Sequence, residues 1–562
     1  MCGIVGIWNQ PDEATVAKMA QAVAHRGPDD LTCVTQDNSS LGASRLAIVG
    51  DPTTPAVFCD SETNITVLLN GEIYNSDVLR AQLSTIGIIF HTNLESEVIA
   101  KLYAHYGLGF AEHLKGMFAV VILDGDRLLL TRDRFGIKPL YYADLGEKVI
   151  FGSEIKALLV HPSISPQLNI AALQESMVFG YIYSADKTLF QGIQQVEPGT
   201  IINFCEGKRS VQKFGELPQA RYQDEGGYPK YQTAIAQLRE HIIETMELLL
   251  RHGDHPMGIY LSGGLDSTIL TLVVRVILGY PVKTFTLADD DTTPDFLAAR
   301  EVAQRLGTQH VERIVGIQDY FSRLEHFVTH YEGLLEAGVF DLQGAPAFHL
   351  ISETVSQHVR VSFSGEGADE LFGGYYCYTH PMGFLDRIRS RMNSVPVGDE
   401  LRQIVDELFP SPEDERIYRR NLLDTLVRSG LANYHLQSVD RSSGAFGFEV
   451  RPAYLFDDLA DFALRLPIEY KVPNKLETKR VLRDAFRPEL ERLGLGWVLE
   501  RKKMGMPSAL SNIAKPIQKR LEAEVSDTAF SEHPMKDYLH TKADIYLFDL
   551  FSKAFLSEPV NA

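Results

Sequence analysis

The chain has 562 residues, of which 45% are hydrophobic and 23% charged, and its net charge at pH 7 is -20. This length exceeds what one hydrophobic core supports, so we expect at least two domains. The acidic balance and the lack of a Lys/Arg-rich run argue against nucleic-acid binding. The chain has no apolar stretch of membrane-spanning length and no recognisable signal peptide, so we expect a cytoplasmic protein that does not bind a membrane.

The five cysteines include one with a special position, Cys2. None belongs to a C-x-x-C pair, which argues against a disulfide framework and against a zinc site. If the initiator Met1 is removed, Cys2 carries a thiol nucleophile and a free α-amine on one residue. An α-amine has a reference pKa near 8 and can serve as a general base at neutral pH. Cys2 is therefore a candidate catalytic nucleophile, although an isolated cysteine is more often a small core residue.

Short strands and turns dominate residues 1–205, which we predict to be one domain. Residues 206–232 are polar, rich in turn-forming residues, and predicted to be a linker. Apolar residues at helical spacing and compact runs of β-forming residues define the elements of the first domain. We expect helices at 15–23 and 95–106, and strands at 65–70, 118–123 and 127–131.

Residues 233–562 form the second predicted domain, in which strands alternate with helices up to about residue 363. Such alternation is typical of βαβ units and of a parallel sheet. From residue 400 onward the pattern is mostly helical. We expect strands at 257–261, 282–287, 310–315 and 359–363, and helices at 267–278 and 295–306.

The segment LSGGLDS at 261–267 lies between a predicted strand and a predicted helix. Its glycines allow a tight turn, so that backbone N–H groups and the helix N-terminus face an anion such as a phosphate. The spacing is not that of a Walker loop. Asp266 is unusual beside an anion unless a divalent cation lies between them.

A second loop, SGEGADELFGGY at 364–375, follows another predicted strand. Ligands of open parallel sheets bind outside the carboxyl ends of the strands. Two glycine-rich loops that contain acids, at two strand ends, therefore predict a site for one nucleotide and its Mg²⁺.

These features together resemble the glutamine-hydrolysing asparagine synthetase family over essentially the whole chain. The second half resembles the synthetase domain of this family through the two loops at 261–267 and 364–375. The first half carries the segments MCGI (1–4), HRGPD (25–29), SRLAI (44–48), NGEIYN (70–75), GMFA (116–119), RDRFGIKPLY (132–141) and SEIKAL (153–158).

The resemblance implies an α/β and α+β fold of two domains. The first would be an N-terminal-nucleophile hydrolase αββα sandwich that acts as a class II glutamine amidotransferase. The second would be a parallel-sheet ATP-pyrophosphatase (PP-loop) domain with a helical C-terminal part. The implied activity is a carbon–nitrogen ligase reaction: glutamine is hydrolysed to ammonia, ATP adenylates a carboxylic acid, and ammonia displaces AMP.

The resemblance also assigns residues to the glutaminase site. Cys2 would attack the side-chain amide of glutamine, and the Asn70 side chain and the Gly71 N–H would stabilise the oxyanion. Arg45 would bind the substrate α-carboxylate. In the family an aspartate binds the α-ammonium, and here Glu95 occupies that position with one extra methylene. The implied glutamine-binding set is Arg45, Ile48, Asn70, Gly71, Glu72 and Glu95.

In the second domain the resemblance places Asp266 and Asp369 as ligands of Mg²⁺. Glu366 is a candidate for proton handling or contact with the acceptor, and Lys503 for offsetting charge in the transition state. The implied ATP-binding set is Leu261, Ser262, Gly263, Gly264, Asp266, Ser267, Leu287, Ser364 and Gly365.

Two segments depart from the family, and we associate both with the acceptor side. Residues 449–457 read EVRPAYLFD, with Phe456 where the family has an aspartate, and the stretch between Glu332 and Pro346 is also altered. Aspartate is the leading acceptor, and another carboxylic acid of a specialised pathway is the main alternative. The oligomeric state is open, with a homodimer as one form.

Two further hypotheses remain: a ring-forming enzyme like β-lactam synthetase, and a non-catalytic binding or regulatory relative. Ring-forming relatives have lost the glutaminase, so the presence of Cys2, Arg45, Asn70 and Gly71 weighs against the first. The intact nucleophile and phosphate loops weigh against the second. Ammonia would be lost in bulk water, so we also expect a shielded passage between the two sites.

Overall fold

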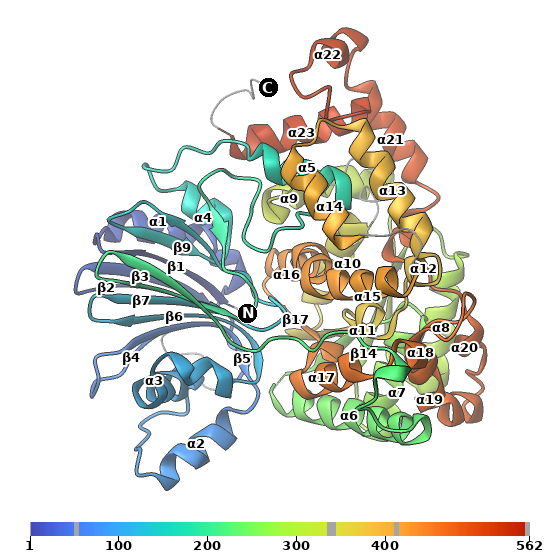
Figure 1. Cartoon of the computed structure of the whole chain (residues 1–562), viewed down its shortest axis with the longest axis horizontal. Helices are drawn as coiled ribbons and strands as arrows, with labels where there is room; N and C mark the ends of the chain where they lie inside the picture. Colours follow the sequence, from blue (N-terminus) through green and yellow to red (C-terminus); the bar gives the residue numbers. More distant parts are fainter. Residues whose placement is uncertain (1, 50–55, 254, 334–343, 410–414, 557–562) are drawn as a thin grey trace.

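The computed structural model describes residues 2–49, 56–253, 255–333, 344–409 and 415–556. The altered stretch that precedes Pro346 lies largely at 334–343, outside the described residues. Figure 1 shows a β-rich N-terminal half beside a larger C-terminal half built mainly of helices.

The N-terminal half contains two six-stranded sheets. The first has the order β10-β8-β9-β1-β3-β2 and the second the order β12-β11-β7-β6-β5-β4. The strands of the first sheet are β1 (Cys2–Trp8), β2 (Asp30–Gln36), β3 (Ser39–Arg45), β8 (Tyr141–Asp144), β9 (Val149–Gly152) and β10 (Gln194–Gln195); those of the second are β4 (Val57–Cys59), β5 (Thr66–Ile73), β6 (Gly116–Asp124), β7 (Arg127–Arg132), β11 (Thr200–Cys205) and β12 (Lys208–Lys213).

Successive side chains of a strand point to opposite faces of its sheet, and in both sheets both faces are buried. Ile4 and Leu41 of the first sheet pack against Val121 and Leu130 of the second, forming a core between the sheets. Helix α1 (Glu13–Ala22) covers the outer face of the first sheet, and α2 (Ser76–Thr85) and α3 (Glu95–Tyr106) cover that of the second. The N-terminal half is thus an αββα sandwich, which confirms the predicted fold.

The C-terminal half is organised around a five-stranded parallel sheet of order β15-β14-β13-β16-β17. All four neighbouring pairs are parallel. The strands are β13 (Met257–Tyr260), β14 (Lys283–Ala288), β15 (Gln309–Ile314), β16 (Val361–Ser364) and β17 (Glu449–Pro452).

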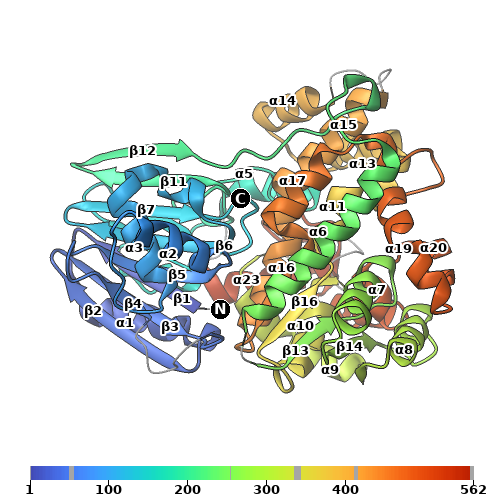
Figure 2. The ribbon, with the colours of Figure 1, turned by 90° about the horizontal axis from the view of Figure 1, so that it is seen from below.

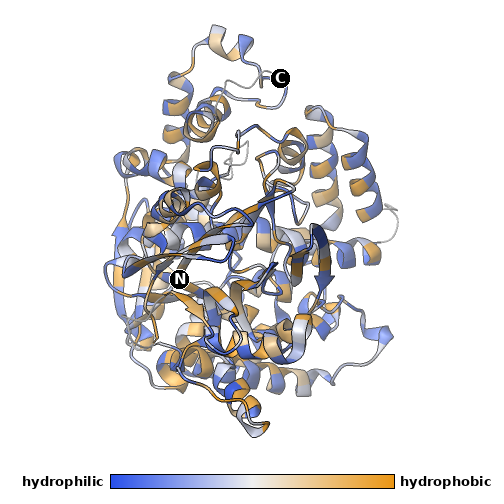
Figure 3. Ribbon diagram, turned by 90° about the vertical axis from the view of Figure 1, so that its left-hand side faces the viewer, coloured by the Kyte–Doolittle hydropathy of each residue, from blue (hydrophilic) through white to orange (hydrophobic). Residues whose placement is uncertain are grey.

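Helices surround this sheet and form the remainder of the C-terminal half (Figure 2). In Figure 3, the helices in view carry both hydrophobic and hydrophilic residues, as expected for helices with one buried face. Within the described residues, no helix is both long and apolar enough to cross a membrane. The longer helices include α6 (Tyr231–Arg251), α8 (Pro294–Leu306), α9 (Ile317–Tyr331), α10 (Gly344–Ser356), α13 (Pro381–Ser394), α15 (Glu415–Thr425), α19 (Arg480–Arg492) and α23 (Lys542–Phe555).

Comparison with the sequence-based elements shows small shifts and two differences. The helix predicted at 267–278 begins earlier, as α7 (Leu265–Leu272), and continues as a π-helical turn at Val273–Ile277. Strand β17 was not predicted. The predicted linker at 206–232 contains β12, which pairs with β11, so the second sheet continues to Lys213.

Candidate functional site

The predicted nucleophile Cys2 begins β1, where strand pairing and side-chain hydrogen bonds bring three separate segments to it. Cys2 lies opposite Arg45 in the antiparallel β1–β3 register, and the Arg45 side chain is buried. The backbone N of Cys2 donates to Asn70 Oδ1 at 2.9 Å, and Arg26 Nε donates to the Cys2 carbonyl at 3.1 Å. Both ends of the Cys2 backbone are therefore fixed.

Asn70 and Gly71 lie in β5, in the part of this strand that contacts Cys2. The Asn70 side chain is fully buried, yet its Nδ2 has no hydrogen-bond partner among the described residues. A buried amide donor without a partner is costly unless a ligand accepts from it. This geometry suits a donor reserved for an oxygen of a bound molecule.

Gly71 can only be glycine at this position. Its φ is +144°, and a Cβ there would lie 1.9 Å from the carbonyl oxygen of Met117 on the paired strand β6. The absent side chain lets the backbone approach closely beside Asn70.

Two carboxylates, Glu72 and Glu95, lie close together next to this segment. Burial, and the negative charge of the other acid, raise the pKa of Glu95 well above its ordinary value. Burial also raises the pKa of Glu72 to about 7, against the opposing effect of Arg451. Glu95 Oε1 accepts from the Ile73 N–H at 3.1 Å. A cationic ligand between these acids would offset the cost of burying two negative charges and would reduce their mutual repulsion.

Sequence reasoning missed the residues that connect this site to the C-terminal half. Glu449 and Arg451 lie in β17; Arg451 Nε donates to Glu449 Oε1 at 2.9 Å, and Arg451 Nη2 lies 3.5 Å from Glu72 Oε1. Lys138 Nζ contacts Glu449 Oε2 at 3.2 Å. Ile48 is buried in the hydrophobic cluster that includes residues of both halves. The segment EVR at 449–451 was a recognisable motif, but its long-range partners were not.

The predicted phosphate loop connects β13 to α7, and the second loop follows the adjacent parallel strand β16. The first loop is bonded to itself: Ser262 N donates to Ser267 Oγ at 3.2 Å, and Gly264 N donates to Ser262 Oγ at 3.3 Å. At Gly263, φ is +69° and a Cβ would lie 2.5 Å from the Ala299 N of α8. The loop therefore packs tightly against α8.

A cavity of about 340 Å³ lies at these strand ends. It brings together most of the predicted nucleotide and metal residues; Gly263 and Gly264 belong to the same loop but do not line the cavity. The predicted residues in its wall are Leu261, Ser262, Asp266, Ser267, Leu287, Ser364, Gly365, Glu366, Asp369 and Lys503.

Asp266 and Asp369, the predicted metal ligands, converge on one buried lysine that sequence reasoning missed. Lys479 Nζ lies 2.6 Å from Asp266 Oδ2 and 2.6 Å from Asp369 Oδ1. Lys503 Nζ contacts Asp369 Oδ2 at 2.5 Å. Burial alone would raise the pKa of Asp369, but the two lysines hold it below its ordinary value.

This acidic pair fits a hard divalent cation. Asp266 Oδ1 is buried and has no hydrogen-bond partner among the described residues. Carboxylate oxygens are the ligands that Mg²⁺ prefers, usually together with substrate phosphates. Asp266 and Asp369 are therefore suited to hold Mg²⁺ beside an ATP molecule at this loop.

Glu366 also lines the cavity, close to His435 and within charge-interaction range of Lys503 and Asp369. Burial raises the pKa of Glu366 to about 6, although the nearby His435 opposes this shift. His435 Nδ1 lies 3.9 Å from Glu366 Oε2, and its Nε2 lies 3.0 Å from the Tyr375 hydroxyl. A carboxyl group with this pKa is suited to accept a proton near neutral pH.

The altered segment around Phe456, which we associated with the acceptor side, lies beside the N-terminal half. Phe456 packs 6.0 Å from the Tyr74 ring of the N-terminal half and does not line the 340 Å³ cavity. Asp457 accepts from the Gly116 N–H at 3.2 Å and pairs with Arg134 at 3.1 Å. After β17 the chain turns toward the sandwich, so this segment forms part of the junction between the halves.

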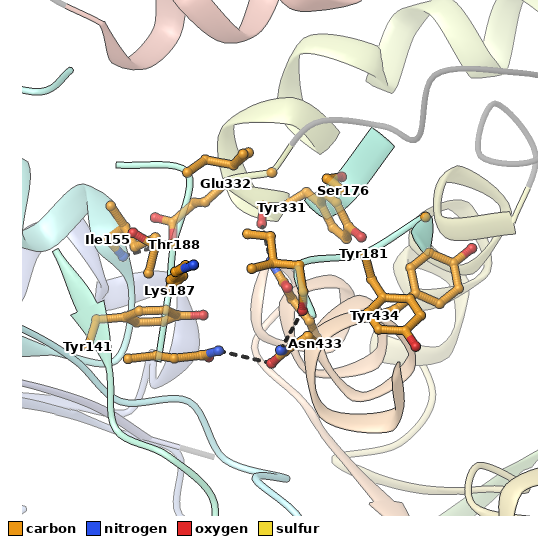
Figure 4. Close-up of a pocket in the computed structure, with 16 residues that line it drawn as sticks. Tyr141, Ile155, Ser176, Tyr181, Lys187, Thr188, Tyr331, Glu332, Asn433 and Tyr434 are labelled. Carbon is orange, nitrogen blue, oxygen red and sulfur yellow. Dashed lines mark hydrogen bonds between the residues drawn. The ribbon is translucent and has the colours of Figure 1, made fainter. Parts of the chain in front are cut away.

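The two halves meet across a second, smaller cavity of about 50 Å³ (Figure 4). Gln195 of β10 donates to Asn433 Oδ1 at 2.9 Å, and the Ile155 N–H donates to Glu332 Oε2 at 2.8 Å. Figure 4 shows side chains from both halves around this cavity, including Tyr434, which also lines the larger one. Specific polar contacts thus fix the two halves relative to each other.

Comparisons with known proteins agree with this arrangement. A family model described as "Glutamine amidotransferase domain" matches residues 1–215, and one described as "Asparagine synthase" matches residues 237–550. The chain is 28% identical to asparagine synthetase [glutamine-hydrolyzing] 1 of Bacillus subtilis, over 90% of this chain and 87% of the relative.

It is also 31% identical to amidase chyE of Penicillium rubens, over 67% of this chain and 59% of that protein. A solved structure described as the allosteric regulatory enzyme of purine biosynthesis covers 56% of this chain and 90% of its own, with a TM-score of 0.32 and 14% identity. On the strength of the family models, this chain belongs to the asparagine synthase family and combines a glutamine amidotransferase domain with an asparagine synthase domain.

Proposed function

We propose that this protein is a glutamine-dependent amide synthetase, in which residues 1–205 release ammonia and residues 233–562 use it to amidate an ATP-activated carboxylic acid. The observation that carries the proposal is the pairing, in one chain, of two prepared sites. One has Cys2 beside Asn70, whose Nδ2 has no hydrogen-bond partner among the residues described, and the other has the Asp266–Asp369 pair beside a phosphate-type loop.

At the first site, Cys2 Sγ would attack the side-chain carbonyl carbon of glutamine after removal of Met1. The freed α-amine would take the thiol proton and pass it to the leaving ammonia. Asn70 Nδ2 and the Gly71 N–H would stabilise the oxyanion, and water would then release glutamate from the thioester. Arg45 would bind the α-carboxylate, and Glu72 and Glu95 the α-ammonium.

At the second site, a carboxylate oxygen of the acceptor would attack the α-phosphorus of ATP and expel pyrophosphate. The loop from Ser262 to Ser267 would bind the phosphates, and Lys503 would offset negative charge in the transition state. Bound Mg²⁺ would neutralise phosphate charge. Ammonia would then attack the acyl carbon, AMP would leave, and Glu366 would accept the surplus proton.

Ammonia has to pass from Cys2 to the larger cavity without meeting bulk water. The tightly bonded junction supports a passage shielded by protein between the halves. The amide acceptor is a separate question: the family name points to aspartate, and the relatives named amidase leave the acid open.

The test is to measure glutamine hydrolysis and ATP-dependent pyrophosphate release in two variants. Cys2→Ala should abolish glutamine-supported synthesis while ammonium salts still support it. Asp266→Ala should abolish synthesis from both nitrogen sources and leave glutamine hydrolysis. Loss of ammonia-supported synthesis in Cys2→Ala, in a protein that still melts cooperatively, would refute the two-site proposal.

A further inference from the structure

The buried side chain of Arg26 connects the nucleophile Cys2 to the C-terminal half. Its Nε donates to the Cys2 carbonyl at 3.1 Å. Its terminal nitrogens form a fork with Asp440: Nη1 donates to Oδ2 at 2.9 Å and Nη2 donates to Oδ1 at 3.0 Å. Nη1 also donates to Glu154 Oε1 at 2.8 Å. One side chain is thus shared between the nucleophile of the glutaminase and a carboxylate of the other half.

The geometry of this fork determines where Arg26 can point its third donor. A guanidinium group is planar and rigid, so its N–H groups cannot be aimed independently. Two parallel hydrogen bonds to the Asp440 carboxylate fix the orientation of that plane, and with it the direction of the Nε–H. Arg26 and Asp440 are both buried, so solvent screens the pair only weakly. The position of Asp440 therefore helps to set the hydrogen bond that Arg26 makes to Cys2.

The peptide between Cys2 and Gly3 carries the whole nucleophile once Met1 is removed. Arg26 holds the carbonyl of this peptide, and the Gly3 N–H donates to Ser44 Oγ at 3.1 Å. The thiol and the α-amine are both attached to the Cα that precedes this peptide. A displaced carbonyl would therefore move both groups away from the position in which they can react.

The helix that carries Asp440 contacts the start of β1 by a second route. Asp440 lies in α16 (Gln437–Gly444), on the side of the C-terminal half that faces the N-terminal sheets (Figures 1 and 2). The next residue, Arg441, is buried and donates from Nη1 to the Ser153 carbonyl at 3.2 Å. The Ile4 N–H of β1 donates to Ser153 Oγ at 3.0 Å. Two consecutive residues of α16 thus restrain the strand that begins with the nucleophile.

We propose that Asp440 is a positioning residue of the glutaminase, which orients Arg26 so that Arg26 holds Cys2 in its reactive position. The inference rests on the proposed function. It makes the glutaminase site of the N-terminal half dependent on a residue of the synthetase half. Val439, the neighbour of Asp440, lines the 340 Å³ cavity, so the same helix contributes to both sites.

The experiment measures glutamine hydrolysis and ammonium-supported pyrophosphate release in the full-length variant Asp440→Asn. The new amide group turns an NH₂ toward one guanidinium N–H, which breaks the fork and leaves the size of the side chain unchanged. We expect the kcat for glutamine hydrolysis to fall by about tenfold to a hundredfold, as for a misplaced reacting group. The KM for glutamine should change less than about twofold, because the residues proposed to bind glutamine are retained. Ammonium-supported pyrophosphate release should persist.

The matched control is Asp461→Asn, which makes the same change at another contact between an arginine and an aspartate of opposite halves. Arg134 Nη2 donates to Asp461 Oδ1 at 2.7 Å, and Arg134 keeps a second carboxylate, Asp457, at 3.1 Å. Within the described residues, none of these three side chains forms a hydrogen bond or an ion pair with Cys2. The control should therefore keep its kcat for hydrolysis within about twofold of the parent. An equal fall in both variants would overturn the inference, since a loosened junction would explain both.

A double-mutant cycle tests whether Asp440 acts through Arg26. Arg26→Lys keeps the positive charge but cannot form the fork, so it should lower the kcat for hydrolysis as Asp440→Asn does. If the two residues act in series, the double variant should lose little more than the more impaired single variant. Labelling of Cys2 by the glutamine analogue 6-diazo-5-oxo-L-norleucine, followed by peptide mass spectrometry, should slow in all three variants. Losses of kcat that multiply in the double variant would overturn the inference.

The remaining outcomes separate the inference from the proposed function. An unchanged kcat for hydrolysis in Asp440→Asn would overturn the inference and leave the proposed function intact. A parallel loss of ammonium-supported pyrophosphate release would also overturn it, because the substitution would then act through the fold of α16. Absence of glutamine hydrolysis in the parent protein would refute the proposed function and this inference with it.

Discussion

The side-chain amide of Asn70 provides the sharpest test of the glutaminase site. Its buried Nδ2 has no hydrogen-bond partner in the described part of the chain, while its Oδ1 accepts from the Cys2 N–H at 2.9 Å. The substitution Asn70→Asp keeps the accepting oxygen and replaces the donor. Loss of one oxyanion donor lowers kcat by about 10²–10³, or about 2.7–4 kcal/mol of transition-state stabilisation. We expect a loss of at least this size because the added carboxylate also repels the oxyanion.

The assay is glutamate release from glutamine, measured beside pyrophosphate release supported by ammonium. The matched control is Asn75→Asp, five residues away. Asn75 Nδ2 donates to the His113 carbonyl at 2.8 Å, and its Oδ1 accepts from the Lys115 N–H at 2.9 Å. This control loses a hydrogen bond and about 1–3 kcal/mol of stability but should keep the glutaminase kcat.

The reasoning would be refuted by either of two results. Glutamine hydrolysis within fivefold of the parent in Asn70→Asp would show that the unpartnered amide stabilises no oxyanion. A parallel loss of ammonium-supported synthesis would show that the substitution acts through folding and not through the glutaminase step.

Three further predictions follow from the contacts at the two sites. Lys479→Met leaves Asp266 and Asp369 without the ammonium that bridges them, so pyrophosphate release should fall at least about a hundredfold while glutamine hydrolysis persists. Normal pyrophosphate release would contradict the role of this lysine. The pKa of Glu72, raised to about 7, means that this carboxyl is increasingly protonated below pH 7 and loses its attraction for the α-ammonium. The KM for glutamine should therefore rise up to about tenfold per pH unit below pH 7, and Glu72→Gln should flatten the profile; a KM independent of pH in the parent protein would contradict this. Gly71→Ala places a Cβ 1.9 Å from the Met117 carbonyl oxygen and should abolish glutamine hydrolysis; retained hydrolysis would show that the strand can move aside.

Local sequence patterns predicted those helices, strands and loops whose conformation is determined by residues close to them in the sequence. The two strand-ending loops at 261–267 and 364–375 were recognisable because glycine, serine and acid at a strand end indicate a phosphate site. The structure places them on adjacent parallel strands, as expected from the alternation of strands and helices. The αββα sandwich came from the family resemblance and was confirmed, since strand runs alone do not determine how two sheets pack.

Contacts between distant segments could not be predicted from local patterns. Lys479 lies 213 residues from Asp266 along the chain, and nothing in its local sequence indicates that it would be buried between two acids. Arg451 reaches Glu72 of the other half in the same way. The contact of Phe456 with Tyr74 could not be predicted, because a motif departure gives no information on which way the chain turns after β17.

The central claim is that one chain transfers the amide nitrogen of glutamine to an acid that ATP has activated. The most direct measurement uses glutamine labelled with ¹⁵N in its side-chain amide, with unlabelled ammonium present and the carboxylic acid that best supports pyrophosphate release from ATP. The account predicts ¹⁵N-labelled amide, with AMP and pyrophosphate formed in equal amounts. Production of ADP and phosphate, or labelled nitrogen found only in free ammonium, would contradict it.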